Sequence, residues 1–176
     1  MLETLISSKT RIKLLLKFFL NPEIKSYLRG LEAEFGESSN AIRVELNKFE
    51  EASLLESAVE GNKKVFTANT KHPLFKSLQQ MLRSYTGIEQ LMDSILLKLG
   101  EVSEIYLIGD LAKGKFSERI DLLFVGNVNE AFLLEILRKA ELKIQKKVRY
   151  LLYDKWTFEK ENPLENEKYK LLIWFK

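Results

Sequence analysis

The spacing of apolar residues changes within the first 86 residues, and this change limits the fold more than any single residue does. Apolar side chains recur every three or four positions over residues 9–20, 26–36 and 39–49, which is the spacing of one face of an α-helix. Two short apolar runs follow at 54–59 and 63–67, with the length and composition of β-strands. We therefore expect three short helices followed by a two-stranded hairpin.

Polar and small residues mark the ends of these helices. Thr10 is a candidate N-cap for the first helix, and Asn21-Pro22 ends it. The second helix is expected to begin near Ser26 and to end at Gly36, because glycine accepts the left-handed conformation of a helix C-cap. A further helix is expected over residues 73–85, after the hairpin.

The third helix is expected to present polar and basic side chains on one face. Ile42, Leu46 and Phe49 form its apolar stripe, so the opposite face is exposed. Two short helices joined by a tight turn, with small polar and basic residues at the start of the second, are typical of a helix that enters the major groove of DNA. The residues expected to contact DNA from this helix are Ser38, Ser39, Asn40, Arg43, Asn47 and Lys48, with Arg43 the best candidate to read a base.

The hairpin is expected to act as a wing. Residues 60–62 form its turn, and Lys63 and Lys64 lie beside the tip, where ammonium groups can contact phosphates without reading sequence. Phosphates repel carboxylates, so tight binding is opposed by three acidic residues on or beside the recognition helix, Glu45, Glu50 and Glu51. Modest affinity per protomer, raised by dimerisation, would reconcile these features.

Residues 11–86 resemble the bacterial winged-helix regulators of the arsenic-repressor-like type. The resemblance is carried by residues 39–55, SNAIRVELNKFEEASLL, followed by residues 60–66, EGNKKVF. It implies a homodimer that binds double-stranded DNA at a near-palindromic site. Ser53 stands where that family usually has a glycine in the bend after the recognition helix, which raises the chance of a shifted helix end.

Composition narrows the remaining classes of function. The sequence has no cysteine and a single histidine, His72, so disulfides and thiolate metal sites are excluded and a reducing, cytoplasmic setting is expected. The apolar runs fall far short of the roughly 20 residues of a membrane span, and no signal-peptide core precedes Thr10. Residues 1–86 carry 13 Lys and Arg against 10 Asp and Glu, whereas the rest carry 15 of each. This small bias does not by itself argue for nucleic acid.

The second half of the chain reads as a separate α/β domain. Gly87 divides the sequence into expected domains of residues 1–86 and 87–176. The expected helices and strands alternate, which is typical of an α/β layer structure. They are a helix over 88–99 ended by Gly100, strands over 105–109 and 120–125 joined by a polar loop at 110–118, a helix from Asn129 or Glu130 to Ala140, and strands over 148–153 and 170–175.

Residues 102–175 resemble the minimal nucleotidyltransferases of the polymerase-beta superfamily. The resemblance is carried by residues 105–114, IYLIGDLAKG, and residues 120–126, IDLLFVG. In that family a strand ends in Gly-Ser, which holds the triphosphate, and the next strand carries Asp-x-Asp, which binds two magnesium ions. Transfer assisted by two metal ions needs those oxygen ligands.

Two of the four motif positions are unsuited to catalysis. Gly109 matches the family's glycine and Asp121 its second aspartate, but Asp110 occupies the serine position and Arg119 the first aspartate. An aspartate would repel a triphosphate, and an arginine would place a cation where a metal ion should lie. The later strand, RYLL at residues 149–152, offers no third carboxylate. We therefore expect no catalysis, no metal ion and no cofactor.

The residues of this degenerate motif have other expected roles. Arg119 is a candidate partner for Asp110 or Asp121, so that a former metal site becomes a salt bridge. Lys113 and Lys115 could attract a nucleotide or another anion as an effector, although a solvated loop is an equally good interpretation.

Three further groups of residues are read as structural. His72 lacks partners for a metal site or a catalytic triad. The acidic stretch over 159–167 is read as a solvated connection. The C-terminal aromatic residues are expected in the core rather than stacked on a base, and they are Trp156, Phe158, Trp174 and Phe175.

Together these patterns predict an α+β two-domain chain, a winged helix-turn-helix followed by a small α/β nucleotidyltransferase-like domain. The predicted function is transcriptional regulation through DNA binding, with the second domain serving dimerisation or effector sensing. Two alternatives stay open: a nucleotidyltransferase with residual activity that uses Asp121, and a protein-protein interaction module with neither activity.

Overall fold

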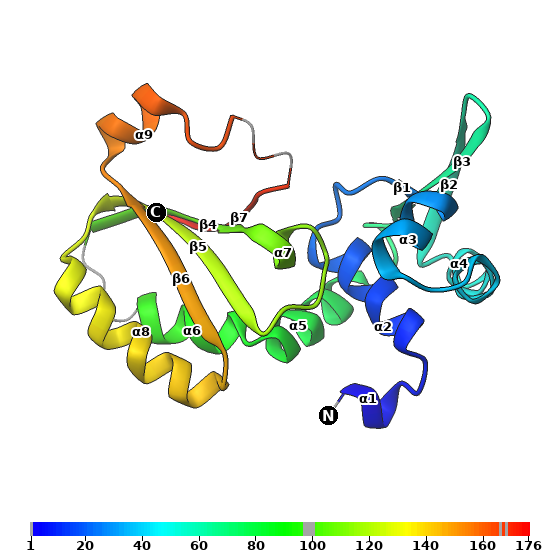
Figure 1. The fold of residues 1–176 in the computed structure, drawn as a ribbon, viewed down its shortest axis with the longest axis horizontal. Coiled ribbons are helices and arrows are strands. Elements are labelled where there is room, and N and C mark those ends of the chain that lie inside the picture. The colour runs from blue at the N-terminus through cyan, green and yellow to red at the C-terminus, as the bar shows by residue number, and fades with distance from the viewer. Residues whose placement is uncertain (1, 97–100, 166, 168) are drawn as a thin grey trace. The chain divides into compact units, whose positions relative to one another are not determined.

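The chain folds into two compact units. The computed structural model describes residues 2–96, 101–165, 167 and 169–176 (Figure 1). The N-terminal unit comprises Met1–Tyr85 and the C-terminal unit Thr86–Lys176. Each unit contains helices and its own β-sheet, so the predicted α+β fold class is confirmed. None of the helices in the described ranges has the length and apolar character needed to cross a membrane.

The N-terminal unit consists of helices around a three-stranded sheet. Helix α2 is continued by a π-helical segment, η1, and the sheet has the strand order β1-β3-β2 with antiparallel pairs. Its elements are α1 (Leu2–Leu5), α2 (Lys9–Leu15), η1 (Leu16–Leu20), β1 (Ser26–Tyr27), α3 (Leu28–Phe35), α4 (Ser39–Glu51), β2 (Leu55–Glu60), β3 (Lys63–Ala68) and α5 (Phe75–Thr86).

The apolar faces of the helices meet in one core, as their spacing predicts. Fully or almost fully buried side chains come from α2, η1, α3, α4 and the sheet, and they include Leu14, Phe19, Leu31, Ile42, Leu46 and Phe66. Strands β2 and β3 form a hairpin in which Glu60 pairs with Lys63 across a turn that begins with Gly61 at φ 62°. The order of helices, strands and hairpin is that of a winged helix-turn-helix.

The second helix begins later than the sequence analysis predicts. Ser26 and Tyr27 are not helical, because they pair with Phe66 and Val65 as strand β1. Helix α3 therefore begins at Leu28, and it ends before Gly36, whose φ of 65° is the predicted left-handed cap.

The bend after helix α4 forms without a glycine. Helix α4 ends at Glu51, and Ser53 adopts a φ of 56°. This left-handed conformation is the one that a glycine accepts at the lowest cost.

The C-terminal unit is a four-stranded mixed sheet with helices on both faces. Its strand order is β6-β5-β4-β7, in which β5 and β6 are parallel and the other neighbours are antiparallel. Helix α8 connects the two parallel strands. The elements are α6 (Ile88–Leu96), β4 (Glu101–Ile108), α7 (Gly109–Ala112), β5 (Arg119–Asn127), α8 (Glu130–Ile144), β6 (Lys147–Tyr153), α9 (Lys155–Glu161) and β7 (Leu171–Phe175).

The two faces of this sheet are covered by different elements. Helices α6 and α8 lie on one face, and α9 lies on the other (Figure 1). On the α9 side, Leu123 and Val125 pack with Leu164 and Phe158. Successive side chains of a strand point to opposite faces, so Asp121 belongs to the same face as these residues.

Two predictions for the C-terminal unit are wrong, and a third concerns residues that the structure does not describe. The polar loop predicted at 110–118 begins with a helical turn, α7, and the predicted acidic connection begins within helix α9, which Asp154 caps through a bond from the Thr157 amide. The predicted helix end at Leu99 and Gly100 lies outside the described residues.

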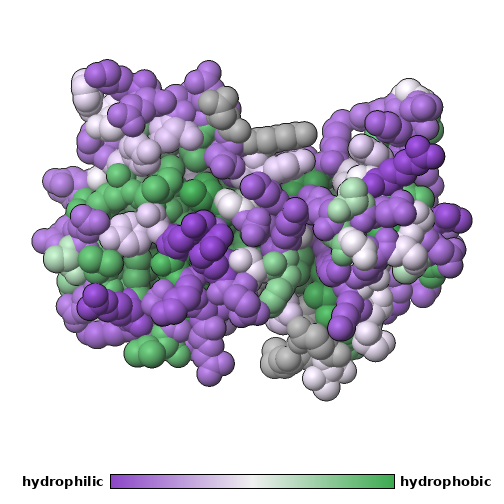
Figure 2. Space-filling view, viewed as in Figure 1, coloured by the Kyte–Doolittle hydropathy of each residue, from purple (hydrophilic) through white to green (hydrophobic). Residues whose placement is uncertain are grey.

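The prediction that the C-terminal aromatic residues form core is wrong for two of them. Trp156 is 67% exposed on α9 and Phe175 is 71% exposed in the last strand. Phe158 is partly buried and stacks on Tyr106. Apolar surface is also visible between α8 and α9, where edge strand β6 carries the half-exposed Leu151 (Figure 2).

Candidate functional sites

Helix α4 begins directly after Ser38, whose side chain caps its first turn. Ser38 has extended backbone angles, and its hydroxyl accepts a hydrogen bond from the Ala41 amide at 3.3 Å. Ile42 and Leu46 are buried, so the helix is oriented with Arg43 and Asn47 exposed. The start of the helix, with Ser39 partly exposed and Asn40 exposed, also faces outward.

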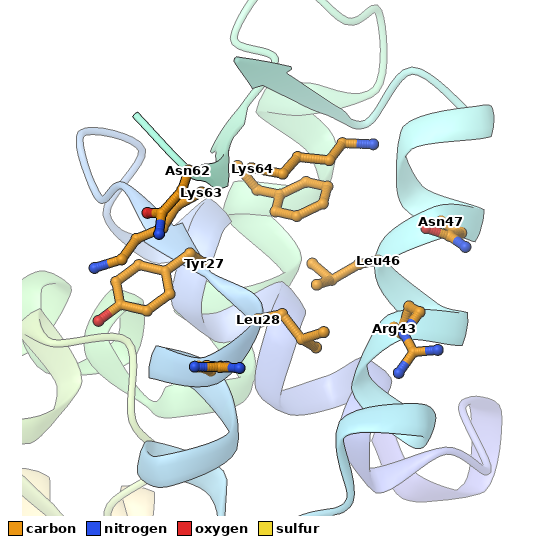
Figure 3. A pocket seen from close by; sticks show the side chains of 10 residues that line it. Tyr27, Leu28, Arg43, Leu46, Asn47, Asn62, Lys63 and Lys64 are labelled. Atoms are coloured by element: carbon orange, nitrogen blue, oxygen red, sulfur yellow. The ribbon is translucent and has the colours of Figure 1, made fainter. Parts of the chain in front are cut away.

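A groove of about 480 Å³ separates part of this helix from the hairpin (Figure 3). Four of the predicted DNA-contacting residues line it together, Arg43 and Asn47 from α4 and Lys63 and Lys64 from β3. The other four predicted residues, Ser38, Ser39, Asn40 and Lys48, do not line this groove.

Sequence analysis missed three polar residues of the groove. Tyr27, Arg29 and Asn62 also line it, and the Lys63 ammonium lies 4.4 Å from the centre of the Tyr27 ring. Tyr27 reaches the hairpin only because β1 pairs with β3. A strand of two residues leaves no periodic signal in the sequence, so this contact could not be inferred from it.

Glu45 faces inward rather than toward solvent. Its side chain is 9% exposed and accepts two hydrogen bonds from Arg11, at 2.8 Å from Nε and 3.2 Å from Nη2. Lys48 Nζ lies 3.6 Å from the same carboxylate. The hydrogen bond from Arg11 lowers the pKa of Glu45. The charge of Glu45 is therefore paired within the unit, and its repulsion of phosphates stays a prediction.

Glu50 connects the recognition helix to the wing. It accepts a hydrogen bond from the Ser57 hydroxyl on β2 and one from Lys64 Nζ at 2.6 Å on β3. These two bonds, that from Lys64 first, lower the pKa of Glu50. Lys64 is thus paired with the Glu50 carboxylate. The neighbouring acid, Glu51, is exposed at the end of α4.

We predict that Arg11→Met lowers the free energy of unfolding at pH 7 by about 1–3 kcal/mol, because it leaves the Glu45 carboxylate buried without its partner. The effect should shrink as the pH falls below the ordinary carboxyl pKa of 4.5, since protonation removes the uncompensated charge. Urea titrations between pH 3 and pH 7 measure both quantities. Lys71→Met, at an exposed lysine elsewhere in the unit, is the matched control, and an equal loss in both variants would contradict the prediction.

In the C-terminal unit the four predicted motif residues and Lys113 converge on one pocket. Gly109, Asp110, Lys113, Arg119 and Asp121 all line a cavity of about 450 Å³. Its other polar lining residues, which sequence analysis did not nominate, are Arg149, Tyr150 and Glu167.

Asp121 is held by two arginines. It is 5% exposed, and its Oδ1 accepts hydrogen bonds from Arg119 Nε at 3.0 Å and from Arg149 Nε at 2.7 Å. Arg149 reaches it because the two residues are register partners in the parallel β5–β6 pair. The predicted ion pair between Arg119 and Asp121 is confirmed, and Arg149 is an additional partner.

Gly109 is the residue that lets Asp121 lie so close to the preceding strand end. It has a φ of 69°, and a Cβ atom there would lie 2.4 Å from Asp121 Oδ2. A side chain at this position would therefore be strained by its backbone and would also collide with the carboxylate.

This donor set does not fit a two-metal centre. Three carboxylates line the pocket, those of Asp110, Asp121 and Glu167, and the buried one, Asp121, is engaged by two guanidinium groups. No cluster of three or more His, Cys, Asp or Glu residues that could hold a metal ion occurs in the part of the chain that the structure describes. Hard divalent cations need several oxygen ligands, and here the charge beside the carboxylate is already positive.

We predict that Gly109→Ala destabilises the protein by at least about 2 kcal/mol, because the methyl group adds a clash to an unfavourable backbone conformation. Gly36→Ala separates the two causes, since Gly36 has a φ of 65° and open space around its Cβ position. The midpoints of urea unfolding should therefore fall further for Gly109→Ala than for Gly36→Ala. Equal shifts would show that the Asp121 contact is unimportant.

Comparisons with known proteins give partial structural likenesses. No protein-family model matches the sequence, and no curated protein does so either. HlyU from Vibrio cholerae, in its reduced form, is 14% identical, with a TM-score of 0.39 over 48% of this chain and 83% of its own. A protein from Archaeoglobus fulgidus is 17% identical, with a TM-score of 0.41 over 51% of this chain and 98% of its own.

A third likeness is to a protein from Sulfolobus solfataricus that is provisionally assigned as a nucleotidyltransferase. It is 19% identical, with a TM-score of 0.38 over 57% of this chain and 87% of its own.

Proposed function

We propose that this protein binds double-stranded DNA through its N-terminal unit and regulates transcription. The observation that carries the proposal is the groove of the winged helix-turn-helix, which is lined by Arg43 and Asn47 of helix α4 and by Lys63 of the wing. A helix that exposes an arginine and an amide can read base edges in the major groove, and a lysine at a wing can contact phosphates.

The cationic side chains of this surface differ in whether a carboxylate already pairs with them. Lys63 lies over the Tyr27 ring, and none of the ion pairs among the described residues involves it. Lys64 is paired with Glu50 and Lys48 is close to Glu45. In this proposal Arg43 and Lys63 carry most of the contact, and Ser38, Ser39 and Asn40 supply amide and hydroxyl groups to phosphates at the helix start.

The C-terminal unit has a supporting role in this proposal, namely dimerisation or the sensing of an anionic effector. Lys113, Arg119 and Arg149 line its pocket and could attract a nucleotide or another anion. Residual nucleotidyltransferase activity is the second candidate, because Gly109 and Asp121, the two residues that match the family's motif, both line that pocket. A magnesium-dependent nucleotide-transfer assay that loses its signal in Asp121→Asn would favour this candidate.

We predict that Arg43→Ala weakens binding to the cognate duplex by about 1–3 kcal/mol and reduces discrimination against a scrambled duplex, as expected when a base contact is lost. Lys63→Ala should weaken binding to both duplexes and reduce the slope of log affinity against log salt by about one unit. Fluorescence anisotropy with DNA from upstream of the protein's own operon, at several salt concentrations, measures both. The assignment of the site is wrong if the double variant binds as tightly as the unchanged protein.

We predict that Glu50→Gln strengthens DNA binding by about threefold to tenfold, because it releases Lys64 to a phosphate, and that it steepens the salt dependence by about one unit. Glu51→Gln is the matched control, since it removes the same charge from the neighbouring residue without releasing a lysine. Equal strengthening by both substitutions would show that only the total charge matters and would reject a specific role for the Glu50–Lys64 pair.

A further inference from the structure

Strand β6 forms an edge of the C-terminal sheet, and no strand of the described residues pairs with its outer side. Its seven residues pair with β5 in a register without a shift, and the strand contains no proline. Natural sheets protect their edges with short strands, bulges, prolines or covering segments. The opposite edge strand, β7, is shorter and pairs through a register shift. The free edge of β6 therefore lacks the protection that β7 has.

The direction of the backbone shows which groups this edge presents. The Lys147 amide donates to the carbonyl of the residue that precedes β5, so Lys147 points toward β5. The Val148 amide points the opposite way, where it donates to the Glu141 carboxylate at 2.8 Å. Backbone groups alternate in direction along a strand, so Tyr150 and Leu152 also direct their amides and carbonyls outward. Among the described residues no partner lies on that side for these two amides.

Apolar side chains accompany these backbone groups. Leu151 is half-exposed on β6, and Trp156 is exposed on α9 shortly after the strand ends. Apolar surface is visible between α8 and α9, where β6 lies (Figure 2). An occupant that uses this edge fully needs an extended backbone of its own and apolar side chains beside it.

A second copy of β6 supplies both. In an antiparallel pair with Leu151 opposite Leu151 of the second copy, Tyr150 of each copy faces Leu152 of the other. Each of these facing pairs exchanges two backbone hydrogen bonds, which satisfies the outward amides. The two leucines on the axis form a pair without hydrogen bonds, in which side chains lie closest together. The Val148 amide keeps its bond to the carboxylate of α8.

The neighbouring registers fit less well. Placing Tyr150 opposite itself requires the Val148 amide, which a carboxylate already occupies. Placing Arg149 opposite itself opposes two like charges, which is unfavourable. In the register centred on Leu151, Arg149 instead faces Tyr153 of the second copy. The edge is therefore complementary to itself in one register.

We propose that two copies of this chain pair through β6, antiparallel and centred on Leu151, so that one β-sheet continues across both C-terminal units. A two-fold axis normal to the sheet gives both copies the same interface. The interface deepens the dimerisation role given above, and its benefit to DNA binding rests on the proposed function. Formation of the dimer does not depend on that function.

Sedimentation equilibrium on the full chain at several concentrations tests the dimer. Leu151→Lys and Leu151→Glu should each raise the dissociation constant of the dimer at least about a hundredfold, because two like charges replace an apolar contact at the axis. Leu172→Lys is the matched control, since it places the same charge on a comparably exposed leucine of the other edge strand, and it should leave the dimer unchanged. A monomeric unchanged protein, or a dimer that survives both Leu151 substitutions, would overturn the proposal.

Mixing the two variants separates lost pairing from misfolding. Leu151→Lys and Leu151→Glu bring opposite charges to the same axis, so an equimolar mixture should form a heterodimer at concentrations at which each variant alone is monomeric. Failure of the mixture to associate would overturn the pairing of Leu151 with its own copy.

Amide hydrogen exchange followed by NMR identifies the edge. Exchange at Tyr150 and Leu152 should slow at least about tenfold between the monomeric and the dimeric concentration range, and it should stay fast in Leu151→Lys. Exchange at these two amides that does not depend on concentration would overturn the interface.

Fluorescence anisotropy with a labelled duplex keeps this inference apart from the proposed function. A protein that dimerises through β6 but binds no DNA would refute the proposed function and leave the interface standing. A protein that binds DNA and stays dimeric in Leu151→Lys would refute the interface alone.

Discussion

The pairing of strand β3 on both of its edges is the interaction on which the N-terminal unit depends. One edge forms the hairpin with β2, and the other binds the two residues of β1 that precede helix α3. The wing is thereby joined by backbone hydrogen bonds to the start of the helix pair. The groove, the contact of Lys63 with Tyr27 and the position of Lys64 near α4 all follow from this pairing.

Two carboxylates of helix α4 that would repel DNA phosphates also stabilise the folded N-terminal unit. Glu45 ties Arg11 of α2 to the recognition helix, and Glu50 ties that helix to both strands of the hairpin. Each acid therefore stabilises the position of helix α4, and it also neutralises the positive charge of the side chain with which it pairs. In the proposed function, the effect of each acid on DNA affinity therefore depends on the partner that it holds.

The sequence predicted the elements whose signals are local. The cap at Gly36, the hairpin turn near Gly61 and the apolar stripe of α4 depend on neighbouring residues, and the structure has them in place. The predicted cap at Thr10 is wrong, because Ser8 caps helix α2 and Thr10 lies inside it. What the sequence did not predict depends on distant residues. Strand β1 exists only because Phe66 and Val65 pair with it, and Arg149 reaches Asp121 only through the β5–β6 register.

The prediction for the C-terminal pocket shows the same division. The motif at Gly109 and Asp121 could be predicted, because residues 105–114 and 120–126 resemble the nucleotidyltransferase motifs. The exposure of Trp156 and Phe175 could not be predicted, because an aromatic residue is equally compatible with a buried core position and with an exposed position.

The double engagement of Asp121 also makes its pairing redundant. If Arg119 is replaced, Arg149 still holds Asp121 from the neighbouring strand. If Arg149 is replaced, Arg119 remains in the same position. A carboxylate without a cationic partner at this position therefore lies at least two substitutions away, and either single substitution leaves the ion pair in place.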